Sequence, residues 1–375
     1  MSELLELEDA RYAAQYFIDY FSEAKGDISE YMRRNKVHTM ESLPNSLPGI
    51  GPEDEFFHDY SMSPEDMEFE IEETTVDKWF SYLQLVSSHN VQTSIPGKSM
   101  VWLVKEKNTN KIVGFVRFGS PVINSKPRNE YLGEPLNSSN KDMMDRFNKS
   151  VIMGFVIIPV QPFGFNYLGG KLLAAMCCSH HARRSLNKKY DANICGFETT
   201  SLYGSSKSAS QYDGMKPFLR YTGLTDSRFL PPLNNDNFHE MHDWFKRKLE
   251  RDLVDPGANS RKLKAQGAMI GITRKSLGDD SLKSKLDECI SEAIEMQERK
   301  RSFICNYGYT NLADYLTLKT DKLQKAENWD RYELENVISW WKKKAVKRHE
   351  SLKKDGRLRE ELEVWNRSSD IDIIR

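Results

Sequence analysis

The stretch VIMGFVIIPVQPFGFNYLGGKLLAAM, residues 151 to 176, decides how the rest of the chain is interpreted. It opens with an apolar run, residues 151 to 160, that is too short to cross a bilayer and suits a strand buried on both faces. A turn follows at residues 161 to 166, and from Tyr167 the apolar residues recur at helical spacing. The stretch therefore predicts a buried strand, a turn and a helix in direct succession.

Two glycines, Gly169 and Gly170, stand in the first turn of that predicted helix. Glycine destabilises a helix, so its presence at both positions needs an explanation, such as the close approach of a ligand to the backbone. A strand, a glycine-bearing turn and a helix N-terminus together aim unpaired N–H groups at an anion. We therefore expect either that residues 160 to 171 hold a phosphate-bearing ligand or that they form an ordinary strand-to-helix connection.

The composition predicts a soluble chain whose charge is unevenly distributed. A chain of 375 residues with 39% hydrophobic residues and a mean hydropathy of -0.64 is expected to form one core domain with helical additions. Residues 1 to 78 carry 20 acidic and 6 basic residues, whereas the whole chain has a net charge of -1. The remainder is therefore basic and can meet a polyanion such as DNA.

The cysteines and the N-terminus indicate the compartment. Five cysteines, an odd number without paired C-x-x-C spacing, favour a set of reduced thiols. The opening MSELLELEDA has neither a basic n-region nor an apolar h-region, so we expect no secretion signal and a cytoplasmic protein.

The first two thirds of the chain read as an α/β pattern with one central crossover. Residues 193 to 199 predict a further strand, which ends near Glu198. The acidic run at residues 65 to 73 is expected to be a solvated segment rather than a mimic of nucleic acid. The other predicted elements are a helix at 4 to 24, a linker at 42 to 75, a helix at 76 to 86, a hairpin at 100 to 120, a polar insertion at 124 to 148, a helix to residue 186 and a last strand at 218 to 222.

The C-terminal third predicts helices at 238 to 252, 281 to 300 and 329 to 365. The last of these is the most basic, with nine basic and two acidic residues between Trp340 and Arg359. This basic face either contacts phosphates or is the solvated side of a docking helix. The candidate nucleic-acid-binding residues are Lys342, Lys343, Lys344, Lys347 and Arg348. The expected domains are an acidic N-terminal helix and linker (1 to 75), a catalytic core (76 to 235) and a helical, basic region (236 to 375).

Residues 100 to 225 resemble the GNAT acyltransferase superfamily. Its acyl-CoA signature, Q/R-x-x-G-x-G/A after the fourth strand, is met by Gln161 and Gly164, while Asn166 stands where a small residue is expected. Within the superfamily the chain is similar to the Mom DNA-modification proteins and the Druantia anti-phage A proteins. The segments that carry this likeness are GFVRFGSP (114 to 121), RF with the long strand (146 to 160), NYLGGKLL (166 to 173), FETT (197 to 200) and SQYDGMKPFLRYTGLT (210 to 225).

The resemblance implies a GNAT-like mixed sheet with added N-terminal and C-terminal helices, and it implies a site. Transfer to an amine needs a base and a proton donor for the leaving thiolate. Glu198 is the candidate base or else a salt-bridged carboxylate, and Tyr212 is the candidate acid or else a core tyrosine. His89 resembles the His-bearing segment at the start of Mom, which implies a catalytic role as a base or a metal ligand, or else it is a surface histidine.

The donor would be acetyl-CoA or another acyl donor bound after the long strand. Adjacent helix positions point about 100° apart, so no more than two of Cys177, Cys178, His180 and His181 could share an ion, and no metal is expected. Residues 204 to 210, GSSKSAS, match no phosphate-loop or serine-nucleophile spacing and predict a flexible loop. The expected cofactor-binding residues are Ile158, Val160, Gln161, Gly164, Asn166, Tyr167, Gly169, Gly170 and Lys171.

Three functions follow as hypotheses. The first is a GNAT-like transferase that modifies an amino group of a DNA base, flipped out of the duplex, in a phage or anti-phage context. The second is a non-catalytic, GNAT-shaped DNA-binding component of a phage or anti-phage complex. The third is a small-molecule N-acetyltransferase.

Overall fold

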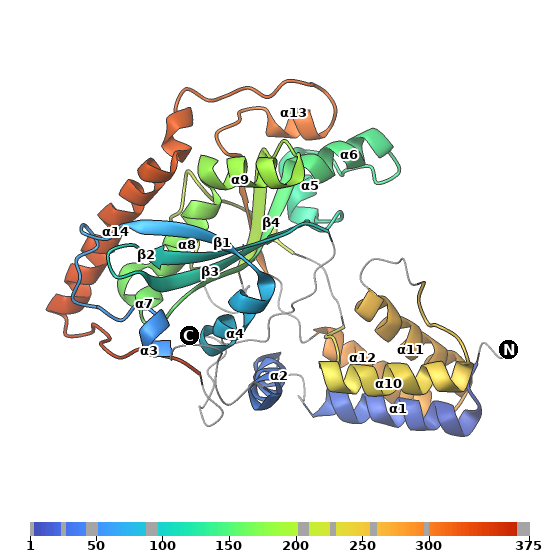
Figure 1. Ribbon diagram of the computed structural model, residues 1–375. Coiled ribbons are helices and arrows are strands. Elements are labelled where there is room, and N and C mark those ends of the chain that lie inside the picture. Colours follow the sequence, from blue (N-terminus) through green and yellow to red (C-terminus); the bar gives the residue numbers. More distant parts are fainter. Residues whose placement is uncertain are drawn as a thin grey trace. The chain divides into compact units, whose positions relative to one another are not determined.

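A seven-stranded mixed sheet is present in the computed structural model, which describes residues 4–23, 28–42, 52–87, 97–201, 210–225, 230–255, 261–295 and 300–365 (Figure 1). The strand order is β1-β2-β3-β4-β5-β7-β6, and β4 and β5 are the parallel neighbours. This confirms the predicted α/β class with added helices. The strands are β1 (Phe69–Thr74), β2 (Ser99–Glu106), β3 (Lys111–Gly119), β4 (Val151–Pro159), β5 (Gly196–Ser201), β6 (Arg220–Leu224) and β7 (Arg301–Cys305).

The chain divides into two compact units, and their boundaries differ from those expected from the sequence. One unit contains residues 1–38, 227–298 and 373–375, and the other contains residues 39–226 and 299–372. The second unit holds the sheet. Its helices are α3 (Pro52–Glu55), α4 (Val76–Val86), α5 (Lys126–Leu132), α6 (Lys141–Ser150), α7 (Phe163–Tyr167), α8 (Gly169–Cys177), α9 (His180–Tyr190), α13 (Leu312–Leu316), the 3-10 helix η1 (Trp329–Tyr332) and α14 (Leu334–Lys354).

The other unit is helical and has its own core. Its helices are α1 (Leu7–Ser22), α10 (Asn235–Leu249), α11 (Arg261–Leu277) and α12 (Ser281–Glu295), and α2 (Ile28–Ser42) begins in it. Phe17 and Phe21 of α1 pack against Met241, Met269 and Leu286 of the other helices. These helices bury their apolar stripes against each other, which gives the unit an independent hydrophobic core. No helix in the described ranges is long and apolar enough to span a membrane.

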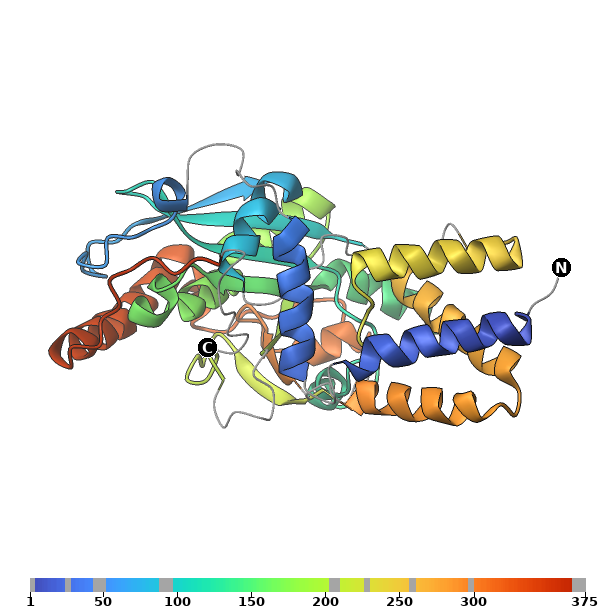
Figure 2. The ribbon, with the colours of Figure 1, turned by 90° about the horizontal axis from the view of Figure 1, so that it is seen from below.

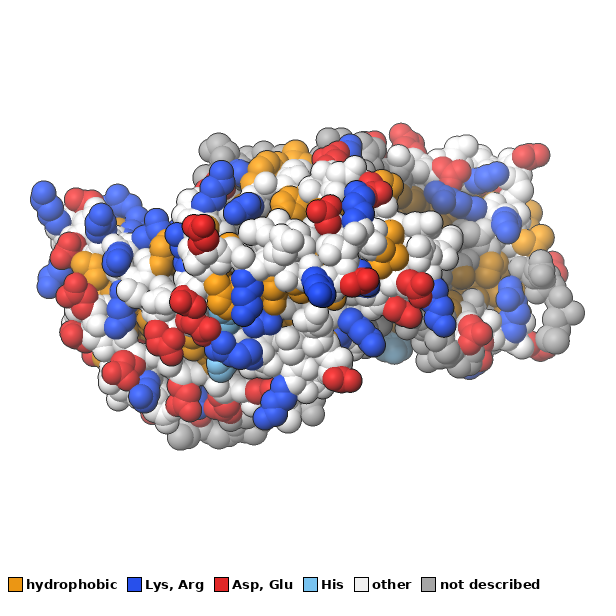
Figure 3. Space-filling view, turned by 90° about the horizontal axis from the view of Figure 1, so that it is seen from above, with side chains coloured by type: hydrophobic (Ala, Val, Ile, Leu, Met, Phe, Trp, Pro, Cys, Tyr) orange, Lys and Arg blue, Asp and Glu red, His pale blue; other side chains and the backbone are white. Residues whose placement is uncertain are grey.

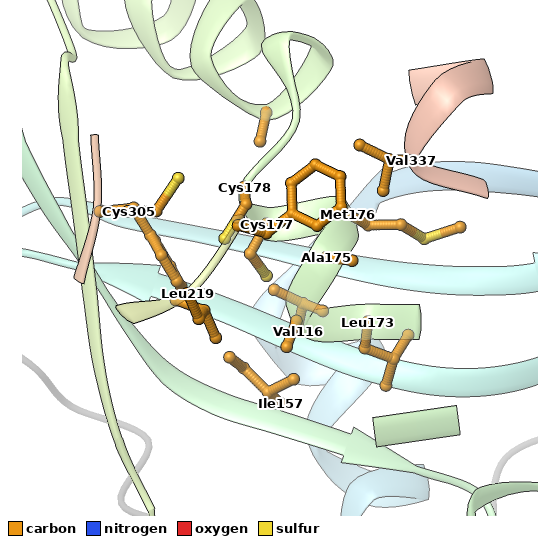
Figure 4. Close-up of a cluster of buried hydrophobic side chains, with 14 of the residues drawn as sticks. Val116, Ile157, Leu173, Ala175, Met176, Cys177, Cys178, Leu219, Cys305 and Val337 are labelled. Atoms are coloured by element: carbon orange, nitrogen blue, oxygen red, sulfur yellow. The ribbon is translucent and has the colours of Figure 1, made fainter. Parts of the chain in front are cut away.

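Alternation along β2 and β3 places a separate cluster of buried residues on each face of these strands. Trp102 and Phe118 join one cluster with α8 and α14, whereas Val101 and Phe115 join another with Trp79 of α4. Figure 2 shows α4 on one side of the strands and α14 on the other. Figure 4 shows part of the first cluster, where Val116 and Ile157 of the sheet face Leu173 of α8 and Val337 of α14 lies nearby.

Two strands were missed by the sequence analysis. Residues 69 to 74, assigned to a linker, form the edge strand β1, and its acidic side chains pair with lysines: Lys105 with Glu72 at 2.7 Å and Lys107 with the adjoining Glu68 at 3.1 Å. Charges suit an edge strand because they discourage further pairing. The other missed strand, β7, lies between β5 and β6 although it comes last in the chain.

Two predicted helices are also shorter than expected. The helix expected to run from Tyr167 to residue 186 is two helices, α8 and α9, because Leu168 has a left-handed backbone (φ 57°) between α7 and α8 and Ser179 caps α9 through Ala182 N–H at 3.2 Å. The basic helix expected to end at residue 365 ends at Lys354. The residues after it form an extended segment rather than a helix.

We expect the aromatic pair at the centre of the sheet to dominate its stability. Phe197 is fully buried, and its ring lies 6.1 Å from that of Phe118. Phe197→Ala should lower the free energy of unfolding by about 3 to 5 kcal/mol in urea titrations, through lost burial and a residual cavity. The matched control Phe155→Ala removes a ring that is 37% exposed, and it should cost about 1 kcal/mol. Equal losses for both variants would contradict this description of the core.

Candidate functional site

The turn after β4 is tightly packed against its own chain. Phe163 is fully buried, with its ring 5.5 Å from that of Phe57 and 5.3 Å from that of Tyr167. A Cβ on Gly169 would lie 2.6 Å from the Phe163 ring, and one on Gly164 would lie 2.5 Å from the Gln161 side chain. Close packing therefore explains these two glycines without a ligand. A Cβ on Gly170 would meet nothing within 4 Å, so close packing does not explain the glycine at this position.

The amides of this turn already have acceptors. Gly164 N–H donates to the carbonyl of Val160 at 2.9 Å, and Asn166 N–H donates to that of Pro162 at 2.8 Å. Phe165 N–H donates to Oε1 of the Gln161 side chain at 3.1 Å. An anion at this turn would have to displace these bonds, so the three amides are not the unpaired donors that the sequence predicts.

The segment after α14 lies across the same turn. Asn166 is fully buried and clamps the backbone of Arg359: its Nδ2 donates to the Arg359 carbonyl at 2.8 Å, and its Oδ1 accepts from Arg359 N–H at 3.2 Å. Glu363 N–H donates to the Gln161 carbonyl at 3.0 Å, and Trp365 N–H donates to the Leu85 carbonyl at 2.7 Å. Residues 357 to 365, which we call the C-terminal strap, thus cover the turn. Asn166, the residue that departs from the acyl-CoA signature, holds the strap.

The other expected cofactor-binding residues are also engaged. Val160 is buried in the core, and Ile158 packs against the cluster on the α4 face. The Tyr167 hydroxyl donates to the Met62 carbonyl at 3.1 Å, and burial raises the pKa of this phenol. Lys171 donates to the Asp213 carbonyl, and burial lowers the pKa of its ammonium group. The nine residues lie together, as their sequence positions require, but most of their polar groups bind the protein itself.

Glu198 is a buried ion-paired carboxylate. It is 5% exposed, and its Oε1 lies 2.7 Å from Nη1 of Arg128, which is 1% exposed. Arg128 also donates to the Val122 carbonyl at 2.9 Å, and its guanidinium lies 4.5 Å from the centre of the Phe147 ring. Burial raises the pKa of Glu198, and Arg128 counteracts that rise. The arrangement matches the salt-bridged alternative for Glu198.

Tyr212 lies on the opposite face of the sheet from Glu198. Its ring is 3% exposed and 5.4 Å from that of Phe303, which pairs with Thr199 between β7 and β5. Successive side chains of a strand point to opposite faces, so Thr199 and Glu198 are separated by the sheet. Burial raises the pKa of the Tyr212 phenol. The structure therefore does not bring the candidate base and the candidate acid together.

Two other sequence predictions lie outside the described residues. His89 falls within residues 88–96, and all but the last residue of GSSKSAS (204 to 210) falls within residues 202–209. Among the residues that the structure describes, no group of three or more His, Cys, Asp or Glu side chains could hold a metal ion. The adjacent Cys177 and Cys178 are buried in the core, and His180 packs 4.0 Å from the Trp329 ring.

Helix α14 presents the basic surface that the sequence predicts. Its apolar side packs through Val337, Trp341 and Leu352, and Nε1 of Trp341 donates to the Tyr167 carbonyl at 2.9 Å. Of the five predicted contacts, Lys342 donates to the Glu65 carbonyl at 2.7 Å and Arg348 donates to the Phe165 carbonyl at 3.3 Å. Lys343 and Lys347 are exposed, Lys344 is partly exposed, and Lys353 and Lys354 continue the exposed set. None of these five lysines has an ion pair within the described ranges. Figure 3 shows lysine and arginine side chains along the edge where Figure 1 places α14, with acidic side chains among them.

Three residues at these sites were not predicted from the sequence: Arg128 beside Glu198, and Arg357 and Arg359 after α14. Arg128 lies in an insertion that was predicted as surface, although it carries the buried partner of Glu198. Arg357 and Arg359 were counted in the basic run but placed on a helix. The glycine at position 356 was the sequence signal for the end of the helix, because a glycine in a left-handed conformation often follows a helix. Gly356 has this conformation, with φ 63°.

Removing Arg128 should reveal the free-energy penalty of burying the Glu198 carboxylate without a partner. Arg128→Met leaves an uncompensated carboxylate and should lower the free energy of unfolding by about 3 to 5 kcal/mol at neutral pH, as measured by urea titration. Without Arg128 the pKa of Glu198 rises further, and a carboxyl with a raised folded-state pKa loses stability as pH rises through that pKa. The deficit should therefore be smaller at about pH 5 than at about pH 8. The double variant with Glu198→Leu should recover most of the loss, and no recovery would contradict a simple ion pair.

Removing the clamp should loosen the strap. Asn166→Ala leaves the Arg359 amide and carbonyl without their partner, which should cost about 1 to 3 kcal/mol. Hydrogen exchange at residues 357 to 365 should become faster, while exchange in β2 and β3 stays unchanged. Unchanged protection of the strap would show that Asn166 does not hold it.

Part of the chain matches a family of known proteins. Residues 27–205 match the family model described as Druantia protein DruA, which is just under half of the chain. The matched range includes β1 to β5, the turn and Glu198, and it ends before Tyr212 and α14. No curated protein and no solved structure matches. The match supports the resemblance to the Druantia anti-phage proteins, whereas the GNAT and Mom resemblance rests on sequence motifs alone.

Proposed function

We propose that this protein is a DNA-binding component of an anti-phage defence system. The defence context comes from the similarity of residues 27–205 to Druantia protein DruA. The partner is argued from α14, whose apolar side is fixed in the core while its lysines face solvent. A helix fixed in this way holds its charges in a constant arrangement, which suits contact with a phosphate backbone.

One observation carries this proposal over acyl transfer: the turn that would hold a donor is covered by the protein's own strap. Asn166, Gln161 and Leu85 each bond to the strap backbone. Glu198 and Tyr212 lie on opposite faces of the sheet, so they cannot serve one transfer together as the base for the amine and the acid for the leaving thiolate. The non-catalytic alternative therefore fits the geometry better.

A transferase that modifies an amino group of DNA is the second candidate, and the sheet supplies the observation that favours it. The parallel strands β4 and β5 pair from Val151↔Gly196 to Gly154↔Thr199. Beyond Thr199, β5 stays paired with β7 but no longer pairs with β4. Ligands of open α/β sheets bind where the carboxyl ends of neighbouring strands diverge. Acetyl-CoA or another acyl donor would then enter beside β4 after the strap had moved.

Duplex-DNA binding tests the proposal. Lys343, Lys347, Lys353 and Lys354 are exposed, and changing all four to Gln keeps helix propensity while it removes four positive charges. Each lost phosphate contact should reduce the slope of log K against log salt by about 0.9, so the quadruple variant should lose up to about 3 to 4 in slope. The measurement is fluorescence anisotropy at several salt concentrations.

The control removes the same charge elsewhere on the sheet unit. Lys141, Lys149, Lys188 and Lys322 are exposed and lie outside α14. Changing these four to Gln should leave the salt slope close to that of the wild type. Equal slopes for all three proteins would overturn the role of α14, and absence of binding by the wild type would overturn the proposal. Nucleosides from cells that express the protein should show no new base, and a new nucleoside lost in Glu198→Gln would establish the transferase instead.

A further inference from the structure

A cluster of three arginines meets the turn at Phe165. The Arg359 guanidinium carbon lies 4.0 Å from the centre of the Phe165 ring, and that of Arg348 lies 4.7 Å from it. Burial lowers the pKa of Arg348, and the nearby positive charges of Arg357 and Arg359 lower it further. We call Arg348, Arg357 and Arg359 the arginine cluster. Two guanidinium groups are thus held against one aromatic side chain, and the Arg357 charge is near that of Arg348.

Each arginine of the cluster projects from backbone that is fixed. Arg348 belongs to α14, which is anchored by Trp341. Arg357 N–H donates to the Leu352 carbonyl at 2.8 Å, which closes the end of the helix. The backbone of Arg359 is clamped by Asn166. The backbone that carries the cluster is therefore ordered without a ligand, so binding would have to order mainly the side chain of Arg357.

The charges of the cluster are only partly balanced. Among the described residues, the cluster forms one ion pair, between Arg359 and Glu363 at 2.9 Å. Repulsion among fixed guanidinium groups is unfavourable unless an anion relieves it. Guanidinium groups bind phosphate through parallel hydrogen bonds, and a phosphodiester carries one negative charge. The excess positive charge of the cluster therefore matches the negative charge of a phosphodiester. The exposed lysines of α14 extend this positive surface.

We propose that the arginine cluster at Phe165 is a phosphate-binding site that receives one phosphodiester of the DNA backbone. This rests on the proposed function, because it names the group that α14 places on the duplex. In this arrangement Asn166 is a positioning residue for Arg359, and Phe165 orients two guanidinium groups by cation–π contact. The cluster contacts backbone and not base edges, so it contributes affinity without sequence preference.

Arg357 provides the cleanest test, because its exposed side chain has no hydrogen bond or ion pair among the described residues. Arg357→Ala should keep the thermal midpoint of the wild type and weaken duplex-DNA binding on the order of tenfold, with a salt slope reduced by about 0.9. Arg357→Lys keeps the charge but not the paired donors, so it should restore the slope and only part of the affinity. The control Arg220→Ala removes an exposed arginine from the edge strand β6 and should bind like the wild type.

Inorganic phosphate separates this inference from the proposed function. It should raise the thermal midpoint of the wild type and of Arg220→Ala but not that of Arg357→Ala. If the wild type binds phosphate in this way but no DNA, the proposed function fails and the phosphate site stands. If DNA affinity and slope are the same in Arg357→Ala and Arg220→Ala, the inference is overturned while DNA binding stands.

Discussion

The clamp between the Asn166 side chain and the Arg359 backbone is the interaction on which the arrangement of this region depends. A fully buried amide that bonds both the carbonyl and the N–H of one residue fixes the strap on the turn. Removing either partner would leave buried polar groups unpaired, which is costly in a packed interior. The clamp thereby joins the end of α14 to the end of β4, two segments far apart in sequence. The same contact places Arg359 beside Phe165 and lays the strap across the turn.

The division of the sheet into two covered faces has a similar consequence. Alternation along β5 sends Glu198 to α5 and leaves Thr199 on the side where Tyr212 packs. Adjacent residues at the end of a strand are therefore neighbours in sequence but not in space. A carboxylate buried with an arginine is held in place by that partner, and such pairs are as often structural as they are catalytic.

Much of the sheet could be predicted from the sequence, because its central strands carry strong apolar runs. Residues 100 to 120 and 151 to 160 gave β2, β3 and β4 to within two residues. β7 could not be found in this way, because five residues after a charged segment carry little periodicity and their place between β5 and β6 is set by long-range packing. The strap was missed because its basic residues continue the composition of α14, although Gly356 ends the helix. The role of Asn166 was hidden for a related reason, since its partner lies almost two hundred residues later in the chain.

The central claim is that the turn at residues 161 to 166 is occupied by the protein's own strap. Hydrogen exchange of the full-length protein, followed at that turn with and without acetyl-CoA, tests it most directly. We predict slow exchange at the amides of Gly164, Phe165 and Asn166 in the free protein and no change when acetyl-CoA is added. Fast exchange in the free protein that becomes slow with acetyl-CoA would contradict the claim and show that the turn is an open donor site.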